Sequence, residues 1–200
     1  MISFYKIKPK FQKLLKPILV GLYKFGITAN QITVSSIVLS LFIGISLWFH
    51  PDYRWGLLVV PTGLLLRMAL NALDGMMART YNMQSKLGEV LNEIGDVISD
   101  LFIFIPMTQI NGLNHELLAL FIGLSIINEF AGFMGKLIGK ERRYDGPMGK
   151  SDRAFLVGII CLILYFRPID LIIINAIFIG ASSLIVLSTV IRLKKGLKDG

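Results

Sequence analysis

The chain has 200 residues, of which 54% are hydrophobic and 17% are charged, and its formal net charge at pH 7 is +8. This composition is too apolar for an ordinary soluble domain, and it indicates an integral membrane protein with a single domain over residues 1–200. Cys161 is the only cysteine, which excludes a disulfide framework and a cysteine-based metal site. The basic residues lie beside apolar segments, so we expect membrane phospholipid, and not nucleic acid, as a partner.

Residues 1–28 combine lysines with a separate apolar face. Six lysines fall between Lys6 and Lys24, while apolar residues recur at helical spacing from Phe11 to Leu22. This pattern is typical of an amphipathic helix that lies in the membrane interface. A cleaved signal peptide is not expected, because a continuous apolar core and a small-residue cleavage site are both missing.

Six apolar segments follow, each near the ~20 residues that a bilayer requires. They cover residues 31–49, 55–79, 88–108, 115–137, 151–166 and 169–191. The sequence therefore predicts an all-α bundle of six transmembrane helices, preceded by the amphipathic segment. Either Thr28 or Asn30 could N-cap the first span, and Ser151 could N-cap the fifth.

The third of these segments is unusual because its first half is acidic. Its acidic residues are Glu89, Glu93, Asp96 and Asp100. Carboxylates are too costly to expose to lipid, so this side of the helix must face protein or water.

The distribution of basic residues predicts the orientation. With both termini in the cytoplasm, only Arg54 and Arg167 of the 21 Lys and Arg fall in opposite loops, and Arg67 lies inside a span. The positive-inside rule therefore places both termini in the cytoplasm. The cytoplasmic ends of the second and third spans then carry the polar residues 71–96, where water-soluble ligands can reach them.

Polar and small residues recur at helical spacing in two sets within this stretch, each set on one helix face. The first set is Asn71, Asp74, Gly75 and Ala78 with Arg79 beside it, and the second is Gly88, Asn92 and Asp96. Where the two faces meet, their oxygen atoms could hold a hard divalent cation, and the small residues would leave room for a phosphate-bearing substrate.

This pattern resembles the signature of the CDP-alcohol phosphatidyltransferases, D-x-x-D-G-x-x-A-R followed after eight or nine residues by G-x-x-x-D-x-x-x-D. Asn71 and Asn92 stand where two of the four aspartates belong. The resemblance implies an integral membrane enzyme of phospholipid biosynthesis. Such an enzyme transfers a phosphatidyl-type group from a CDP-alcohol, commonly CDP-diacylglycerol, to an alcohol hydroxyl and releases CMP. Homodimers are common in that family, so a second copy of the chain is also a candidate partner.

The resemblance also implies a role for each matching residue. Asp74 is the expected principal ligand of Mg²⁺ or Mn²⁺, and Asp96 is the expected general base and a further metal ligand. Asn71 and Asn92 would be neutral metal ligands. The CDP moiety is expected to lie against Asp74, Gly75, Ala78, Arg79 and Gly88. The alternative is that Asp74 and Arg79 only pair with helix neighbours.

The two asparagines leave several alternatives open. With two carboxylates, the metal site is expected to be weakened or to hold one ion. Glu93 is adjacent in angle to Asp96 and could supply the charge that Asn92 lacks, or it could face an aqueous cavity. The alternative function is a catalytically weak or silent relative that binds nucleotide or lipid. A small transporter is disfavoured because the sequence shows no symmetric, interrupted halves.

A second basic cluster spans residues 140–153. The resemblance makes Lys150 and Arg153 candidates for binding an anionic acceptor or the diphosphate, whereas Lys140, Arg142 and Arg143 could instead anchor lipid headgroups. Within the spans, Arg67 and Glu129 could line a cavity or pair with each other. The sequence does not decide between these two arrangements.

Overall fold

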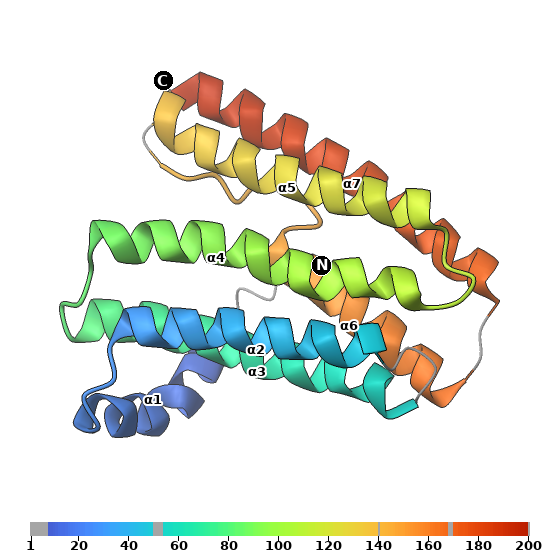
Figure 1. Cartoon of the computed structure of the whole chain (residues 1–200). Helices are drawn as coiled ribbons and strands as arrows, with labels where there is room; N and C mark the ends of the chain where they lie inside the picture. Colours follow the sequence, from blue (N-terminus) through green and yellow to red (C-terminus); the bar gives the residue numbers. More distant parts are fainter. Residues whose placement is uncertain (1–7, 50–53, 140, 168–169, 200) are drawn as a thin grey trace.

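The computed structural model describes residues 8–49, 54–139, 141–167 and 170–199, and every regular element in these ranges is helical (Figure 1). The elements are α1 (Lys8–Lys24), α2 (Ala29–Phe49), α3 (Arg54–Thr80), α4 (Lys86–Phe104), the 3₁₀ helix η2 (Ile105–Gln109), α5 (His115–Ile138), α6 (Lys150–Phe166) and α7 (Leu171–Asp199). The all-α prediction is confirmed. Residues 1–7 of the expected amphipathic segment lie outside the described residues.

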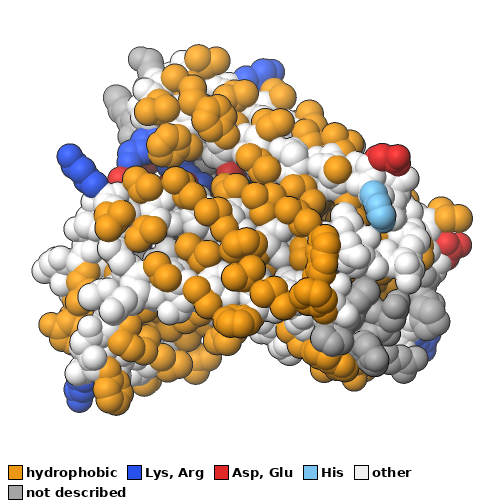
Figure 2. Space-filling view, viewed as in Figure 1, with side chains coloured by type: hydrophobic (Ala, Val, Ile, Leu, Met, Phe, Trp, Pro, Cys, Tyr) orange, Lys and Arg blue, Asp and Glu red, His pale blue; other side chains and the backbone are white. Residues whose placement is uncertain are grey.

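Four helices of the described part, α2, α3, α5 and α7, are long and apolar enough to cross a membrane. The other two expected spans correspond to α4, which is strongly acidic, and α6, which has 17 residues. The face shown in Figure 2 is largely hydrophobic, and its charged side chains gather mainly near the helix ends.

Two of the predicted spans differ from the structure by more than two residues at one end. The segment expected over 88–108 is α-helical only to Phe104, because Pro106 lacks an N–H group and lies in the first turn of the 3₁₀ helix η2, which begins at Ile105. The last helix continues past residue 191 to Asp199, so its basic C-terminal residues extend the helix beyond the apolar segment.

The helix starts show how the chain sets up the site. Thr28 and Gln31 form a capping box at the start of α2, with each side chain accepting a hydrogen bond from the other residue's backbone N–H, at 3.3 and 2.9 Å. Ser85 caps α4 by accepting from the Gly88 N–H at 3.0 Å. Ser151 does not cap α6 as expected. That helix starts one residue earlier, and Asp152 accepts from the preceding Gly149 N–H at 3.0 Å.

Helix α2 packs between α3 and α4, α3 packs also against α6, and α5 pairs with α7 on the other side of α4 (Figure 1). The main apolar core includes a row of aromatic rings from α4, α5 and α7. Phe104 and Phe121 have ring centroids 5.5 Å apart, and Phe121 and Phe178 5.1 Å apart. A second apolar cluster joins α1 to α2 and α3. Helix α4 therefore lies centrally, within reach of cations on several neighbouring elements.

Close contact between α2 and α4 depends on Gly44, because a Cβ there would collide with the backbone carbonyl oxygen of Phe102. We expect Gly44→Ala to lower the free energy of unfolding by about 1–3 kcal/mol, since the added methyl group overpacks the helix crossing. Thermal unfolding in detergent measures this effect. Gly180→Ala is the matched control, because nothing lies within 4 Å of a Cβ at that position. Equal unfolding temperatures for the two variants would contradict the prediction.

Candidate active site

The polar face of α3 is supported by hydroxyl groups from α2. The Thr33 hydroxyl donates a hydrogen bond to Asp74 Oδ2 at 2.9 Å, and the Ser36 hydroxyl donates to Asn71 Oδ1 at 2.7 Å. Asp74 is buried. The sequence interpretation did not include Thr33 and Ser36, although their i, i+3 spacing mirrors that of Asn71 and Asp74. These contacts orient the oxygen atoms of α3 toward α4.

Asp96 of α4 completes this polar centre. The Asn71 amide donates to Asp96 Oδ1 at 3.3 Å, and the Lys150 ammonium forms an ion pair with Asp96 Oδ2. The Arg67 guanidinium lies 3.8 Å from Oδ1. Asp96 is also close enough to Asp74 to interact with it electrostatically. The structure thus brings together Asn71, Asp74 and Asp96 as the sequence predicted.

The small residues of the motif allow close approach. A Cβ at Gly75 would lie 3.4 Å from the guanidinium nitrogens of Arg79, which folds back over this position. A Cβ at Gly88 would come within 2.7 Å of Asn30 Oδ1 on α2. Ala78 is half-buried and packs in the cluster formed with α1. Gly88 therefore permits close contact between α2 and α4, whereas a Cβ at Gly75 would make only an ordinary van der Waals contact with Arg79.

Arg79 is exposed and forms no ion pair with any residue in the described ranges. Its guanidinium is therefore available to an anion. Asp74, in turn, is bonded to Thr33 and to the neighbouring backbone N–H of Gly75, and not to Arg79. The two residues do not neutralise each other.

Among the described residues, the side chains of Asn92 and Glu93 form no hydrogen bond or ion pair with Asn71, Asp74 or Asp96. Asn92 is exposed, and within the described part of the chain its side chain has no hydrogen-bond partner. Glu93 is half-buried and pairs with Arg142 at 2.9 Å. As a substitute metal ligand, Glu93 would have to leave Arg142.

Each acidic residue on α4 pairs with a cation from another element. The pairs are Glu89 with Lys136, Glu93 with Arg142, Asp96 with Lys150, and Asp100 with Arg67 and Arg153. This row of ion pairs joins α4 to α3, α5, α6 and the segment before α6. Buried carboxylates are tolerated here because each one has a cationic partner.

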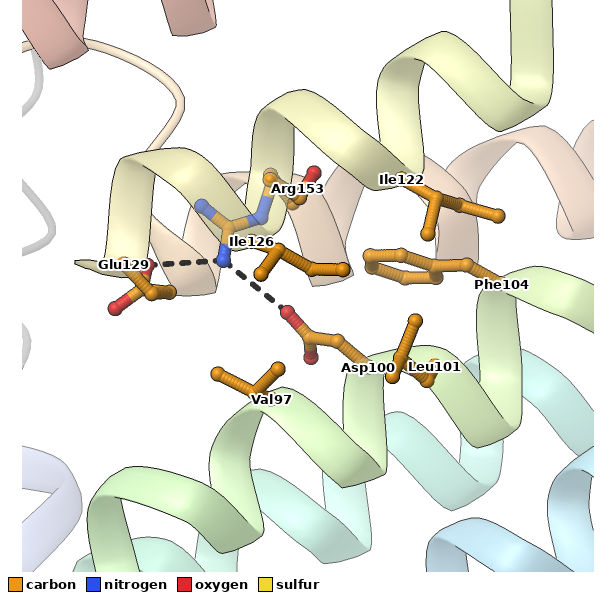
Figure 3. A pocket seen from close by; sticks show the side chains of 9 residues that line it. Val97, Asp100, Leu101, Phe104, Ile122, Ile126, Glu129 and Arg153 are labelled. Carbon is orange, nitrogen blue, oxygen red and sulfur yellow. Dashed lines mark hydrogen bonds and ion pairs between the residues drawn. The ribbon is translucent and has the colours of Figure 1, made fainter. Parts of the chain in front are cut away.

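The deepest part of this network surrounds Arg153, which is fully buried. Its Nη2 lies 2.9 Å from Glu129 Oε1 and 3.1 Å from Asp100 Oδ2, beside a small pocket between α4 and α5 (Figure 3). Glu129 also pairs with Arg142 at 2.7 Å and with Arg192 at 3.7 Å. Arg67 and Glu129 therefore pair with separate partners and not with each other. In this state, the guanidinium of Arg153 is already bound by protein carboxylates.

The segment between α5 and α6 is tied to the end of α7. A hydrogen bond and ion pair from the Lys195 ammonium hold the pKa of the Asp145 carboxyl below its ordinary value. Because the pKa is lowered in the folded state, this pair stabilises the fold at neutral pH, and the contribution is lost as the pH falls through the lowered pKa. Arg192 Nε also donates to the Asp145 carbonyl oxygen at 3.1 Å. These contacts fix the chain that leads to Lys150.

The donor set at the polar centre fits one divalent cation. Asp74 and Asp96 offer carboxylate oxygens, which are the ligands that Mg²⁺ and Mn²⁺ prefer. The Asn71 amide turns its nitrogen to Asp96 and its oxygen to Ser36, so it would have to rotate to present that oxygen to an ion. Asp96 already binds a cationic group, the Lys150 ammonium. Among the described residues, no three Asp, Glu, His or Cys side chains form a metal-binding group. The set is therefore poorer in charge than a site with four carboxylates.

A sequence model of the CDP-alcohol phosphatidyltransferase family matches residues 26–191. The chain belongs to this family. It is 45% identical to the inner membrane protein YnbA of Escherichia coli over 79% of this chain and 78% of that protein. It is 32% identical to archaetidylinositol phosphate synthase of Pyrococcus horikoshii, over 48% of each chain.

A solved structure has the same fold. It is the Mycobacterium tuberculosis phosphatidylinositol phosphate synthase PgsA1 with CDP-DAG bound, with a TM-score of 0.75 and 19% identity over 92% of this chain and 94% of that one. The likeness extends over nearly the whole bundle, including the helices that carry the polar centre.

Arg153 is expected to be essential for the fold. Arg153→Met should lower the free energy of unfolding by about 3–5 kcal/mol, because it leaves two buried carboxylates without this partner. Lys136→Met is the matched control, since its ion pair with Glu89 is half-exposed. Thermal unfolding of both variants in detergent checks the difference. A stable Arg153→Met protein with weakened acceptor binding would instead show that Arg153 is a ligand of the acceptor.

Proposed function

We propose that this protein transfers a phosphatidyl-type group from a CDP-alcohol, in the first place CDP-diacylglycerol, to the hydroxyl of a polar alcohol and releases CMP. One observation carries the proposal. Asp74 and Asp96 come from two helices to one polar centre, and each is bonded by a residue from a further helix. The name of the Pyrococcus relative and the CDP-DAG in the neighbouring structure support this substrate class.

The proposal places all six helices α2 to α7 across the membrane, with α1 in the interface. Helix α4 can cross because its acidic side chains are paired within the bundle. Helix α1 packs on the bundle through Leu15 and Leu19, while Leu14, Ile18 and several lysines are exposed. The polar centre, the turn after α3 and both termini then face the cytoplasm, as the positive-inside rule predicts.

In this proposal, the exposed Arg79 guanidinium and the Lys150 ammonium bind the diphosphate of the CDP-alcohol. The acceptor oxygen attacks the phosphorus on the lipid side, and the bond from that phosphorus to the bridging oxygen breaks. Asp96 accepts the hydroxyl proton, and CMP departs with the bridging oxygen. A divalent cation held by Asp74, Asp96 and Asn71 would neutralise charge on the leaving group. Thr33 and Ser36 keep Asp74 and Asn71 oriented throughout.

The acceptor is expected to lie beside Lys150, between α4 and the segment before α6. Arg153 contributes by holding Asp100 and Glu129 in place, and it becomes an acceptor ligand only if it leaves one of them. Lys150 is the more accessible of the two cations, because 31% of its side chain is exposed.

Asp74→Asn and Asp96→Asn should each reduce CMP release by about 100-fold or more, since the first removes the negative charge of a metal ligand and the second also removes the proton acceptor. The assay uses purified protein with CDP-diacylglycerol, Mg²⁺ or Mn²⁺ and a panel of polar alcohols. Glu116→Gln, an exposed carboxylate at the start of α5, is the matched control and should keep full activity. CDP-lipid binding without CMP release from any acceptor would favour a catalytically silent relative.

Asn71→Asp should lower the free energy of unfolding of the metal-free protein, because it replaces the amide that donates to Asp96 with a second negative charge. We expect its unfolding temperature to fall in EDTA and to recover when Mg²⁺ or Mn²⁺ is added. Asn92→Asp, on the exposed face, should change it little. If the wild type is an enzyme, the variant with both Asn71→Asp and Asn92→Asp should release CMP at the same rate as the wild type or more slowly. Activity that appears only in the double variant would show that the asparagines silence this chain.

A further inference from the structure

The ammonium of Lys150 occupies a distinctive place among the cations of the bundle. It pairs with Asp96, and it also interacts electrostatically with Asp74 and Glu93. Its ion-pair partner is Asp96, whereas Glu93 is paired with Arg142.

Two other cations near the centre are held mainly by other carboxylates, and the exposed Arg79 has no carboxylate partner in the described ranges. Arg67 lies 2.8 Å from the Asp100 carboxylate but 3.8 Å from the Asp96 carboxylate, and it donates to the Asp96 backbone carbonyl at 3.2 Å. Arg142 is held by Glu93 at 2.9 Å. Lys150 differs because its main partner is Asp96. It is also the first residue of α6, and its side chain is 31% exposed, so its flexible stem can follow a ligand.

The charge at the centre makes this lysine significant. Asn71 and Asn92 are neutral, so Asp74 and Asp96 carry the formal charge of the donor set. One divalent cation neutralises those two carboxylates, whereas four carboxylates would neutralise two such ions. With one divalent ion bound, Lys150 supplies further positive charge for a diphosphate, together with the exposed Arg79.

We infer that Lys150 is the second cation of this site, so that the chain combines one divalent ion with one ammonium group. The inference rests on the proposed function and assigns the phosphate-binding charge within it. In the resting state Lys150 balances Asp96. When the divalent ion binds Asp96, the ammonium is released to the phosphate oxygens of the nucleotide. Lys150 therefore opposes metal binding and favours anion binding.

The test compares Lys150→Met with the wild-type full chain in detergent, using Mn²⁺ titration followed by electron paramagnetic resonance. Removing a positive charge a few ångströms from the ion should tighten Mn²⁺ binding by about tenfold. CMP binding at saturating Mn²⁺, measured by calorimetry, should weaken by about tenfold or more, because a charge-assisted bond is lost. Lys136→Met, on the same side of the bundle and paired with Glu89, should change neither constant.

Two further variants sharpen the result. Lys150→Arg keeps the charge and should retain weak Mn²⁺ binding and tight CMP binding. Lys150→Met combined with Asn71→Asp and Asn92→Asp should bind two Mn²⁺ ions per chain. This variant has four motif carboxylates, and it lacks the ammonium group that opposes metal binding.

Opposite shifts of the two constants support the inference. Unchanged constants in Lys150→Met, or weaker binding of both ligands together with a lower unfolding temperature, would overturn it and make Lys150 structural. Absence of Mn²⁺ binding in every variant would also overturn it. Failure of the proposed function is seen separately: the wild-type protein then releases no CMP, although Lys150→Met still shifts the two binding constants as expected.

Discussion

The structure depends on neutralising a row of carboxylates inside a helical bundle. Helix α4 carries one acidic side chain on nearly every turn of one face, and each has a cationic partner on a neighbouring element. An unpaired charge in such surroundings is far more costly than an unpaired charge in water. The position of α4 is therefore set by electrostatics as well as by apolar packing, and its neighbours must supply arginine and lysine at matching depths.

The same requirement couples the fold to the candidate active site. At one end of the row, Asp100 is held by Arg67 and Arg153, which leaves little freedom for these groups. At the polar centre, Asp96 is held by a partly exposed lysine and a side-chain amide, which are easier to displace. The ion pairs of Asp100 thus fix the position of α4, and with it the position of Asp96, whose partners can be exchanged.

Asn71 shows why the motif departs from four aspartates without losing its geometry. As an amide, Asn71 accepts from Ser36 and donates to Asp96, so one side chain links α2, α3 and α4. A carboxylate at this position would repel Asp96 unless a cation lay between them. The asparagine thereby stabilises the centre without a bound ion, and it lowers the charge available for binding one.

The sequence by itself determined the family, the all-α class, most helix limits and the meeting of Asp74 with Asp96, because these follow from hydrophobic periodicity and a local motif at helical spacing. It did not determine which residues from distant segments complete the site. Thr33 and Ser36 reach the centre from α2, and the pairing of Lys150 with Asp96 depends on where α6 packs. The pairing of Glu129 with Arg153 instead of Arg67 depends on the relative depth of three helices. Those contacts join residues far apart in the chain, so only the tertiary structure decided them.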